Sequence, residues 1–241
     1  MPSTPDRRSP QGRSDRAAAL REQARAERHR RLRFTLIVGI VVAMVIAGLT
    51  IAALSTSGGP PRSTAPEAGI PATPMKTASG RTTEPPWAAP SDASARVAAA
   101  GLRMLGEEGQ VEHIHTHLDV IVNGKPVTVP GNIGIDRNAK LISPLHTHAE
   151  NGVIHVESPV KAVFTLGQFM TEWDVALTQD SIGGLKADSA NEFHAYVNGK
   201  ERPGNPAAIE LRDHDEIALI YGPAGLKVDV PSSFDWPKKA K

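Results

Sequence analysis

The sequence contains no cysteine among its 241 residues. Disulfides, thiolate metal sites, iron–sulfur clusters and a lipid-modified anchor cysteine are therefore excluded. Aromatic residues are scarce at 4 %, whereas 21 glycines and 20 prolines are present. Because a folded core needs large apolar side chains, this composition indicates that part of the chain is linker.

Several catalytic motifs are also missing. The sequence contains no HExxH, no GxSxG and no phosphate-binding glycine loop, the motifs of zinc proteases, serine hydrolases and nucleotide-binding enzymes. These absences favour a binding protein over an enzyme. The basic residues cluster before an apolar run rather than on a folded domain, which argues against nucleic-acid binding.

Residues 34–54 form an apolar run of 21 residues without a charge. At 1.5 Å per residue, a helix over this run is about 31 Å long, which matches a bilayer core. Seven arginines lie in residues 14–33, whereas Arg62 is the only one in residues 55–74. This asymmetry predicts a single-pass anchor with a cytoplasmic N-terminus and an external C-terminal domain. A cleaved signal peptide is the alternative, but the run is longer than a typical apolar core of a signal.

The composition divides the chain into five parts. They are a basic cytoplasmic segment 1–33, a transmembrane helix 34–54, a Pro/Gly-rich linker 55–90, a His-rich extracytoplasmic domain 91–230 and a loosely held tail 231–241. The expected partners are the lipid bilayer, through 34–54, and a protein of the cell envelope.

The external part is predicted to be an α+β domain. Helices are expected over 91–108 and 165–173, the second carrying an apolar stripe at i, i+3, i+4 and i+7 with Thr165 as N-cap. Alternating patterns predict strands over 111–122, 125–129, 152–157, 193–197 and 216–221. Asn123-Gly124 and Asn198-Gly199 are typical hairpin turns. A mostly antiparallel sheet with one main helix across a face is the simplest assembly.

Histidines are concentrated in this domain. Six of the nine fall between positions 113 and 155, in HIHTH, HTH and VIHVE segments. Alternate side chains of a strand point to opposite faces, so one face of the first segment carries imidazoles while the other is apolar and packs into the core. The candidate metal ligands are His113, His115, His117, His146, His148 and His155. Asp119 and Glu157 share these faces as further ligands or as groups that orient a ring.

Neutral imidazole is a common ligand of zinc and copper. Histidines two apart on a strand have Cβ atoms about 6.5–7 Å apart, and His113 and His117 are about 13 Å apart. One ion therefore takes two of the first three histidines together with one or two from the later segments. A cluster without metal, which protonates near pH 6, is the alternative.

Two resemblances add to this pattern. The segments EHIHTHLD, SPLHTH, GVIHVESP and FTLGQF resemble a family of membrane-anchored, His-rich, uncharacterised proteins of high-GC Gram-positive bacteria, which implies anchoring but no reaction. The segment from Tyr196 to Ile220 resembles the closing strands of β-grasp domains, as in sulfur-carrier proteins. The chain continues past Gly222, so the free terminal Gly-Gly of the sulfur carriers is missing.

The sequence thus favours a membrane-tethered protein that binds copper or zinc outside the cytoplasm. One alternative is a surface metalloenzyme, either cupin-like or a zinc hydrolase in which Glu157 or Asp119 acts as base for a bound water. The other alternative is a metal-free interaction module of the envelope.

Overall fold

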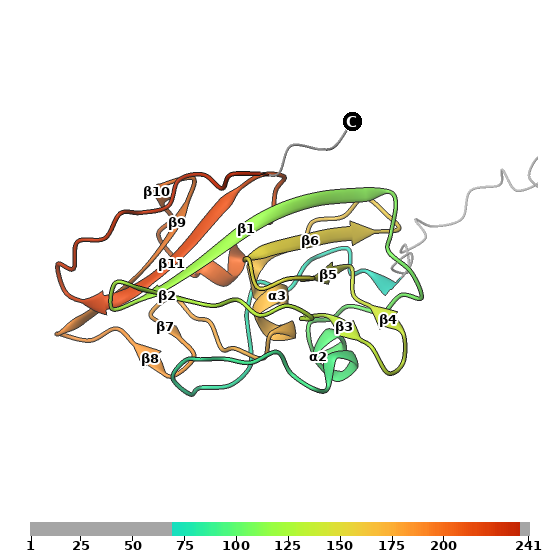
Figure 1. Ribbon diagram of the computed structural model, residues 1–241, viewed down its shortest axis with the longest axis horizontal. Helices are drawn as coiled ribbons and strands as arrows, with labels where there is room; N and C mark the ends of the chain where they lie inside the picture. Colours follow the sequence, from blue (N-terminus) through green and yellow to red (C-terminus); the bar gives the residue numbers. More distant parts are fainter. Residues whose placement is uncertain (1–68, 237–241) are drawn as a thin grey trace, which may run out of the picture. The chain divides into compact units, whose positions relative to one another are not determined.

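The structure is a computed structural model and describes residues 69–236 (Figure 1). Its main element is a seven-stranded sheet with the order β10-β9-β11-β1-β6-β5, in which β2 also pairs with β1. These strands are β1 (Glu112–Val122), β2 (Lys125–Val127), β5 (Leu145–His146), β6 (Val153–Ser158), β9 (Asn191–Val197), β10 (Lys200–Glu201) and β11 (Glu216–Pro223). With helices α2 (Ala93–Ala99) and α3 (Leu166–Glu172), the described residues form an α+β domain, which confirms the predicted class.

The sheet is built around the hairpin of β1 and β2. Asn123 and Gly124 have φ of 52° and 74°, the left-handed conformations that a tight hairpin turn requires. β2 pairs only with the end of β1, and the first half of β1 pairs antiparallel with β6. β1 therefore has partners along most of its length, and its side-chain alternation is fixed by the pairing.

The centre of the sheet is a parallel pair that the sequence did not predict. β11 runs parallel to β1 and antiparallel to β9, whereas the other pairings of the sheet are antiparallel. Residues Glu216–Gly222 of β11 are buried. The continuous apolar run over 217–221 is typical of a central strand that is covered on both faces.

The helices cover one face of the sheet (Figure 1). α3 begins with the expected cap, because the Thr165 side chain accepts from the Gln168 N–H and the Gln168 side chain accepts from the Thr165 N–H. Its apolar stripe is fully buried against the sheet. α2 is much shorter than the expected helix over 91–108: it ends at Ala99, and Gly101 turns the chain with φ of 71°.

Residues 69–90 differ from the expectation of a free linker. Trp87 is 2 % exposed and contacts Trp173 edge-on, with ring centroids 5.8 Å apart. The Arg81 side chain donates to the backbone oxygens of Trp173 and Asp174 and pairs with the Asp174 carboxylate. This Pro-rich segment therefore belongs to the folded domain, since its few large side chains complete the core around α3.

Smaller elements surround the sheet. They are the hairpins β3 (Ile135–Asp136) with β4 (Leu141–Ile142) and β7 (Ser181–Ile182) with β8 (Leu185–Lys186), and the 3-10 turn η2 (Pro206–Ala208). The expected transmembrane segment 34–54 lies outside the described residues. Within 69–236, no helix is long and apolar enough to cross a membrane.

Candidate metal centre

Three neighbouring strands present a histidine at the same level of the sheet. His115 of β1 pairs in register with His155 of β6, and His155 pairs with His146 of β5. Side chains of directly paired residues project from the same face. The pairing therefore forms a lateral row of imidazoles from three segments that are separated in sequence.

Two further histidines extend this row. The ring centroid of His113 lies 5.0 Å from that of His115, and the centroid of His148 lies 4.6 Å from that of His155. We call the five side chains the histidine cluster: His113, His115, His146, His148 and His155. Within it, the His115 and His155 centroids are 4.6 Å apart and those of His146 and His155 are 5.2 Å apart. The sequence prediction that the separate histidine segments meet is thus matched by five of the six rings.

A buried carboxylate lies within the cluster. Glu157 pairs in register with His113, and its Oε1 lies 3.4 Å from His113 Nε2 and 3.3 Å from His155 Nδ1. The residue is 4 % exposed, and its Oε2 is buried with no hydrogen-bond partner within the described residues. Burial, followed by the charge of Glu108 and a side-chain hydrogen bond with Glu108, raises the pKa of Glu157 to about 7. Leaving a buried carboxylate oxygen unpaired is costly, and either a proton or a bound cation removes this cost.

Two rings of the cluster, those of His146 and His155, are held neutral. Burial lowers the pKa of His146 to about 4, and burial together with the neighbouring histidines lowers the pKa of His155 to about 3. His146 Nδ1 lies 3.0 Å from the Ser143 carbonyl oxygen, which can only accept, so Nδ1 carries the hydrogen. The lone pair of His146 is therefore on Nε2, which lies 3.1 Å from His148 Nε2.

The donor atoms form two groups that share one carboxylate. Donor atoms of His146, His148, His155 and Glu157 lie within 4.8 Å of one another, and so do those of His113, His115 and Glu157. Nitrogens bound to one zinc ion at about 2.0–2.1 Å are roughly 3.3 Å apart in a tetrahedral shell. In the metal-free chain His146 Nε2 and His148 Nε2 are 3.1 Å apart and His155 Nδ1 and Glu157 Oε1 are 3.3 Å apart, as hydrogen-bonded pairs, and these separations are also close to the value for a metal shell.

His117 is the one predicted ligand with a different environment. Its Nδ1 lies 2.8 Å from Glu216 Oε2 and its Nε2 lies 2.9 Å from the Asn151 carbonyl oxygen. Burial alone would lower the pKa of His117, but the hydrogen bond and charge of Glu216 outweigh it and raise that pKa. Burial also raises the pKa of Glu216. In the metal-free chain both nitrogens of His117 are therefore engaged, Nδ1 by Glu216 and Nε2 by Asn151.

The searches return no relative. No protein-family description, curated protein or solved structure matches this chain.

Residues 234–236 contact the histidine-bearing face of the sheet, whereas the sequence predicted a loosely held tail. Phe234 stacks on His117 with ring centroids 4.0 Å apart and an interplanar angle of 15°. Trp236 lies against His214 at 4.7 Å and 6.3 Å from His115. Aromatic stacking holds residues 234–236 on the sheet, and the alternating polar and apolar pattern gave no sign of this contact.

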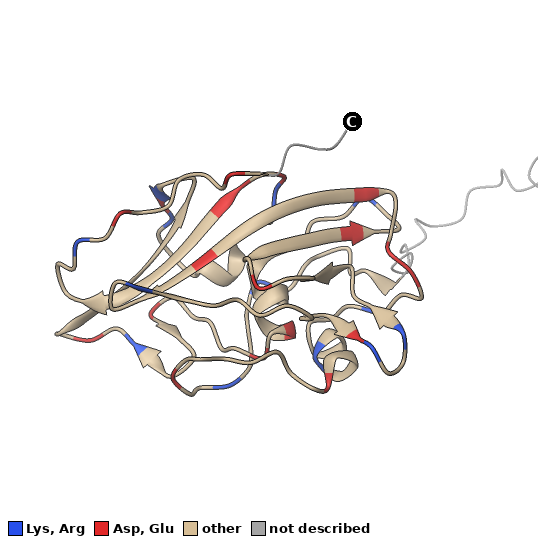
Figure 2. Cartoon of the chain, viewed as in Figure 1, with Lys and Arg blue, Asp and Glu red and all other residues tan. Residues whose placement is uncertain are grey.

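Three carboxylates lie on the histidine-bearing face of the sheet: Asp119 of β1, Glu157 of β6 and Glu216 of β11. Figure 2 shows acidic positions on these strands, and none of the three strands contains Lys or Arg. Asp119 belongs with His117 and Glu216 to a third group of possible donors. Glu108, which the sequence did not single out, lies 3.6 Å from His148 through its Oε1. The field on this face therefore favours cations over anions.

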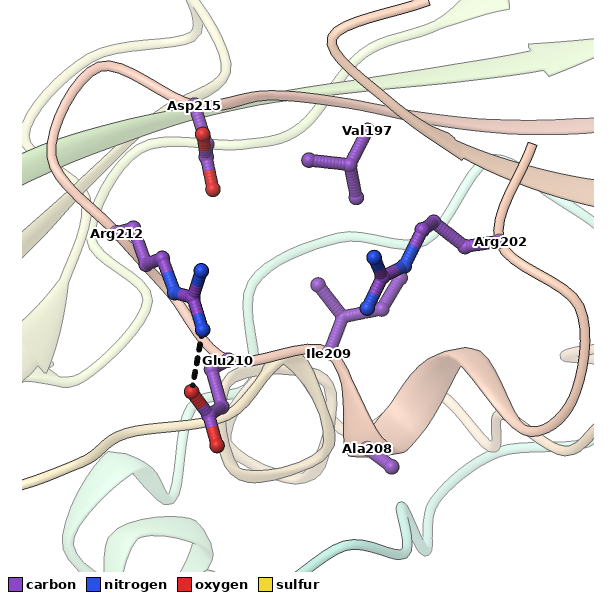
Figure 3. A pocket seen from close by; sticks show the side chains of 7 residues that line it. All are labelled: Val197, Arg202, Ala208, Ile209, Glu210, Arg212 and Asp215. Atoms are coloured by element: carbon purple, nitrogen blue, oxygen red, sulfur yellow. Dashed lines mark hydrogen bonds and ion pairs between the residues drawn. The ribbon is translucent and has the colours of Figure 1, made fainter. Parts of the chain in front are cut away.

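A separate cavity of about 180 Å³ lies beside β9 and the turn that precedes β11 (Figure 3). Its charged side chains are Arg202, Glu210, Arg212 and Asp215, and Arg212 is paired with Glu210 at 3.0 Å. Two positive and two negative groups balance, so the cavity selects no charge class of ligand. The histidine cluster ranges from the buried His146 to the half-exposed His113, and it needs no large cavity because a metal ion needs only converging donors.

Proposed function

We propose that the domain binds a Cu(II) or Zn(II) ion through His146, His148, His155 and Glu157. The observation that carries this proposal is the grouping of donor atoms of these four residues within 4.8 Å of one another, on three imidazoles and the Glu157 carboxylate. Three imidazoles and one carboxylate complete a four-coordinate shell for zinc and also suit copper.

The protonation states support this ligand set. A metal binds neutral imidazole and ionised carboxylate, so bound protons compete with it. His146 and His155 have pKa values of about 4 and about 3 and are neutral at pH 7. The cost of placing neutral rings around a buried carboxylate is offset once a cation lies among them.

The same geometry favours a binder over an enzyme. Catalytic zinc sites keep a coordination position for water, whereas closed sites use four protein ligands. The group around Glu157 offers four donors, each from this chain. We therefore infer that this ion is held and released rather than used as a catalyst.

The location of the function follows from the sequence pattern. We infer that residues 34–54 anchor the chain in the bilayer and that the histidine cluster lies outside the cytoplasm. An anchored domain of this kind captures copper or zinc at the cell surface or passes it to an envelope protein.

Titration of the purified full-length chain with Cu(II) and Zn(II), in competition with a chromophoric chelator, tests the proposal. Binding that is lost in a His148→Ala/His155→Ala variant and kept in His194→Ala would support it. His194 is a matched control because it lies on β9 and pairs with Glu201 at 2.7 Å, outside the cluster. Failure of the wild-type chain to compete for either metal would overturn the proposal.

A further inference from the structure

The histidine cluster offers more donors than one ion can use. Five imidazoles and Glu157 lie together, yet zinc in a tetrahedral shell takes four ligands. His113 and His115 are left over from the group around His146, and they form a second group with the same carboxylate. This surplus is explained if the cluster holds two ions side by side.

Glu157 has the position that a bridging ligand requires. It lies between the two groups, because it pairs in register with His113 on β1 and is two residues from His155 on its own strand. A carboxylate can be shared by two ions, and two-metal sites place the ions about 3.5–4 Å apart. Oε1 of Glu157 lies 3.4 Å from His113 Nε2 and 3.3 Å from His155 Nδ1, so it faces a donor of each group.

We propose that Glu157 bridges a pair of divalent metal ions, one held by His146, His148 and His155 and the other by His113 and His115. This inference rests on the proposed function, since the first ion is the one assigned above. The second ion has three protein donors, so at least one coordination position is left for water or an incoming ligand.

The two positions are similarly accessible. Each group contains one histidine whose side chain is about half exposed, His148 at 46 % in the first and His113 at 50 % in the second.

Elemental analysis and electron paramagnetic resonance of the full-length chain after equilibrium dialysis against Cu(II) test this inference. The wild-type chain is expected to hold two equivalents, with the magnetic signals of the two ions coupled through the carboxylate. His113→Ala should lose one equivalent and show the signal of an isolated Cu(II) ion. Because His113 is half exposed, circular dichroism of this variant should be unchanged.

The remaining outcomes separate the two proposals. One equivalent in the wild-type chain, with an isolated signal, would overturn the paired centre and leave the proposed function standing. Two equivalents with uncoupled signals, or two equivalents retained in His113→Ala, would also overturn it. No bound copper would overturn both. The control His194→Ala should keep two coupled equivalents, because this residue lies outside the cluster.

Discussion

His155 and His117 lie on neighbouring strands of the same sheet face, and their pKa values are shifted in opposite directions. His155 is surrounded by other imidazoles, so burial and mutual repulsion keep it neutral. His117 contacts a carboxylate and a carbonyl oxygen, so both nitrogens are engaged. Position in an alternating pattern therefore does not decide the role of a histidine; its cross-strand neighbours do.

The largest expected effect comes from removing the inner ligands. His146→Ala/His155→Ala should weaken Cu(II) or Zn(II) binding by more than about 1,000-fold, because loss of a single supporting contact around a metal ligand already costs about 10–100-fold. Competition titration measures the change. His117→Gln should keep the wild-type metal affinity. An equal loss of affinity in that variant would contradict the conclusion that His155 is a ligand and His117 is not.

The second-largest expected effect is on the free energy of unfolding rather than on metal affinity. His117→Ala should lower it by about 3 kcal/mol, because Glu216 is left buried without its partner. Since the pKa of His117 is raised above 6.5, its contribution is complete below pH 6.5 and is lost as the pH rises through the raised value. Denaturant unfolding of the metal-free chain at several pH values measures both features.

The matched control for this variant is the exposed pair of His194 and Glu201. His194→Ala should change the free energy of unfolding by less than about 0.5 kcal/mol, because exposed ion pairs contribute little. Equal losses of unfolding free energy in His117→Ala and His194→Ala would show that the buried pair of His117 and Glu216 stabilises the fold no more than the exposed pair.

The pH dependence of metal affinity is a further test of the role of Glu157. Glu157 has a pKa of about 7 and must be ionised to bind a metal. Below pH 7 the affinity should therefore fall by about tenfold per pH unit, with one proton released per chain on binding. Calorimetry in buffers of different ionisation enthalpy counts that proton. In Glu157→Gln the affinity should be weaker and this proton should no longer be released.

The smallest expected effect concerns the tail. Phe234→Ala should lower the free energy of unfolding by about 1 kcal/mol, because it removes the stack on His117. Metal affinity should stay the same, since His117 is not among the proposed ligands. A large loss of affinity in Phe234→Ala would indicate that residues 234–236 take part in the metal centre.

Much of the site could be predicted from the alternation within single strands. The period of two placed His113 and His115 on one face and Leu118 in the core, and the Asn-Gly turns fixed both hairpins. The spacing could not show which rings meet. The row from His115 to His146 depends on the register of β6 against both of its neighbours, and β5 is only two residues long.

The environment of His117 could not be predicted from the sequence either. Glu216 reaches His117 only because β11 is parallel to β1 and adjacent to it, a pairing between segments almost 100 residues apart. The contact of Phe234 depends on the path of the tail over the sheet. The contribution of Trp87 to the core was missed because a Pro-rich composition is also typical of linkers. Each of these contacts is non-local, and no local pattern encodes them.

The central proposal is that three imidazoles, from β5, from the loop that follows β5 and from β6, hold a metal together with Glu157. Anomalous X-ray diffraction from crystals of the metal-loaded chain, recorded at the zinc or copper absorption edge, tests it most directly. The account predicts an anomalous peak within bonding distance of His146, His148, His155 and Glu157. A peak at another residue such as His194, with none at the histidine cluster, would contradict it.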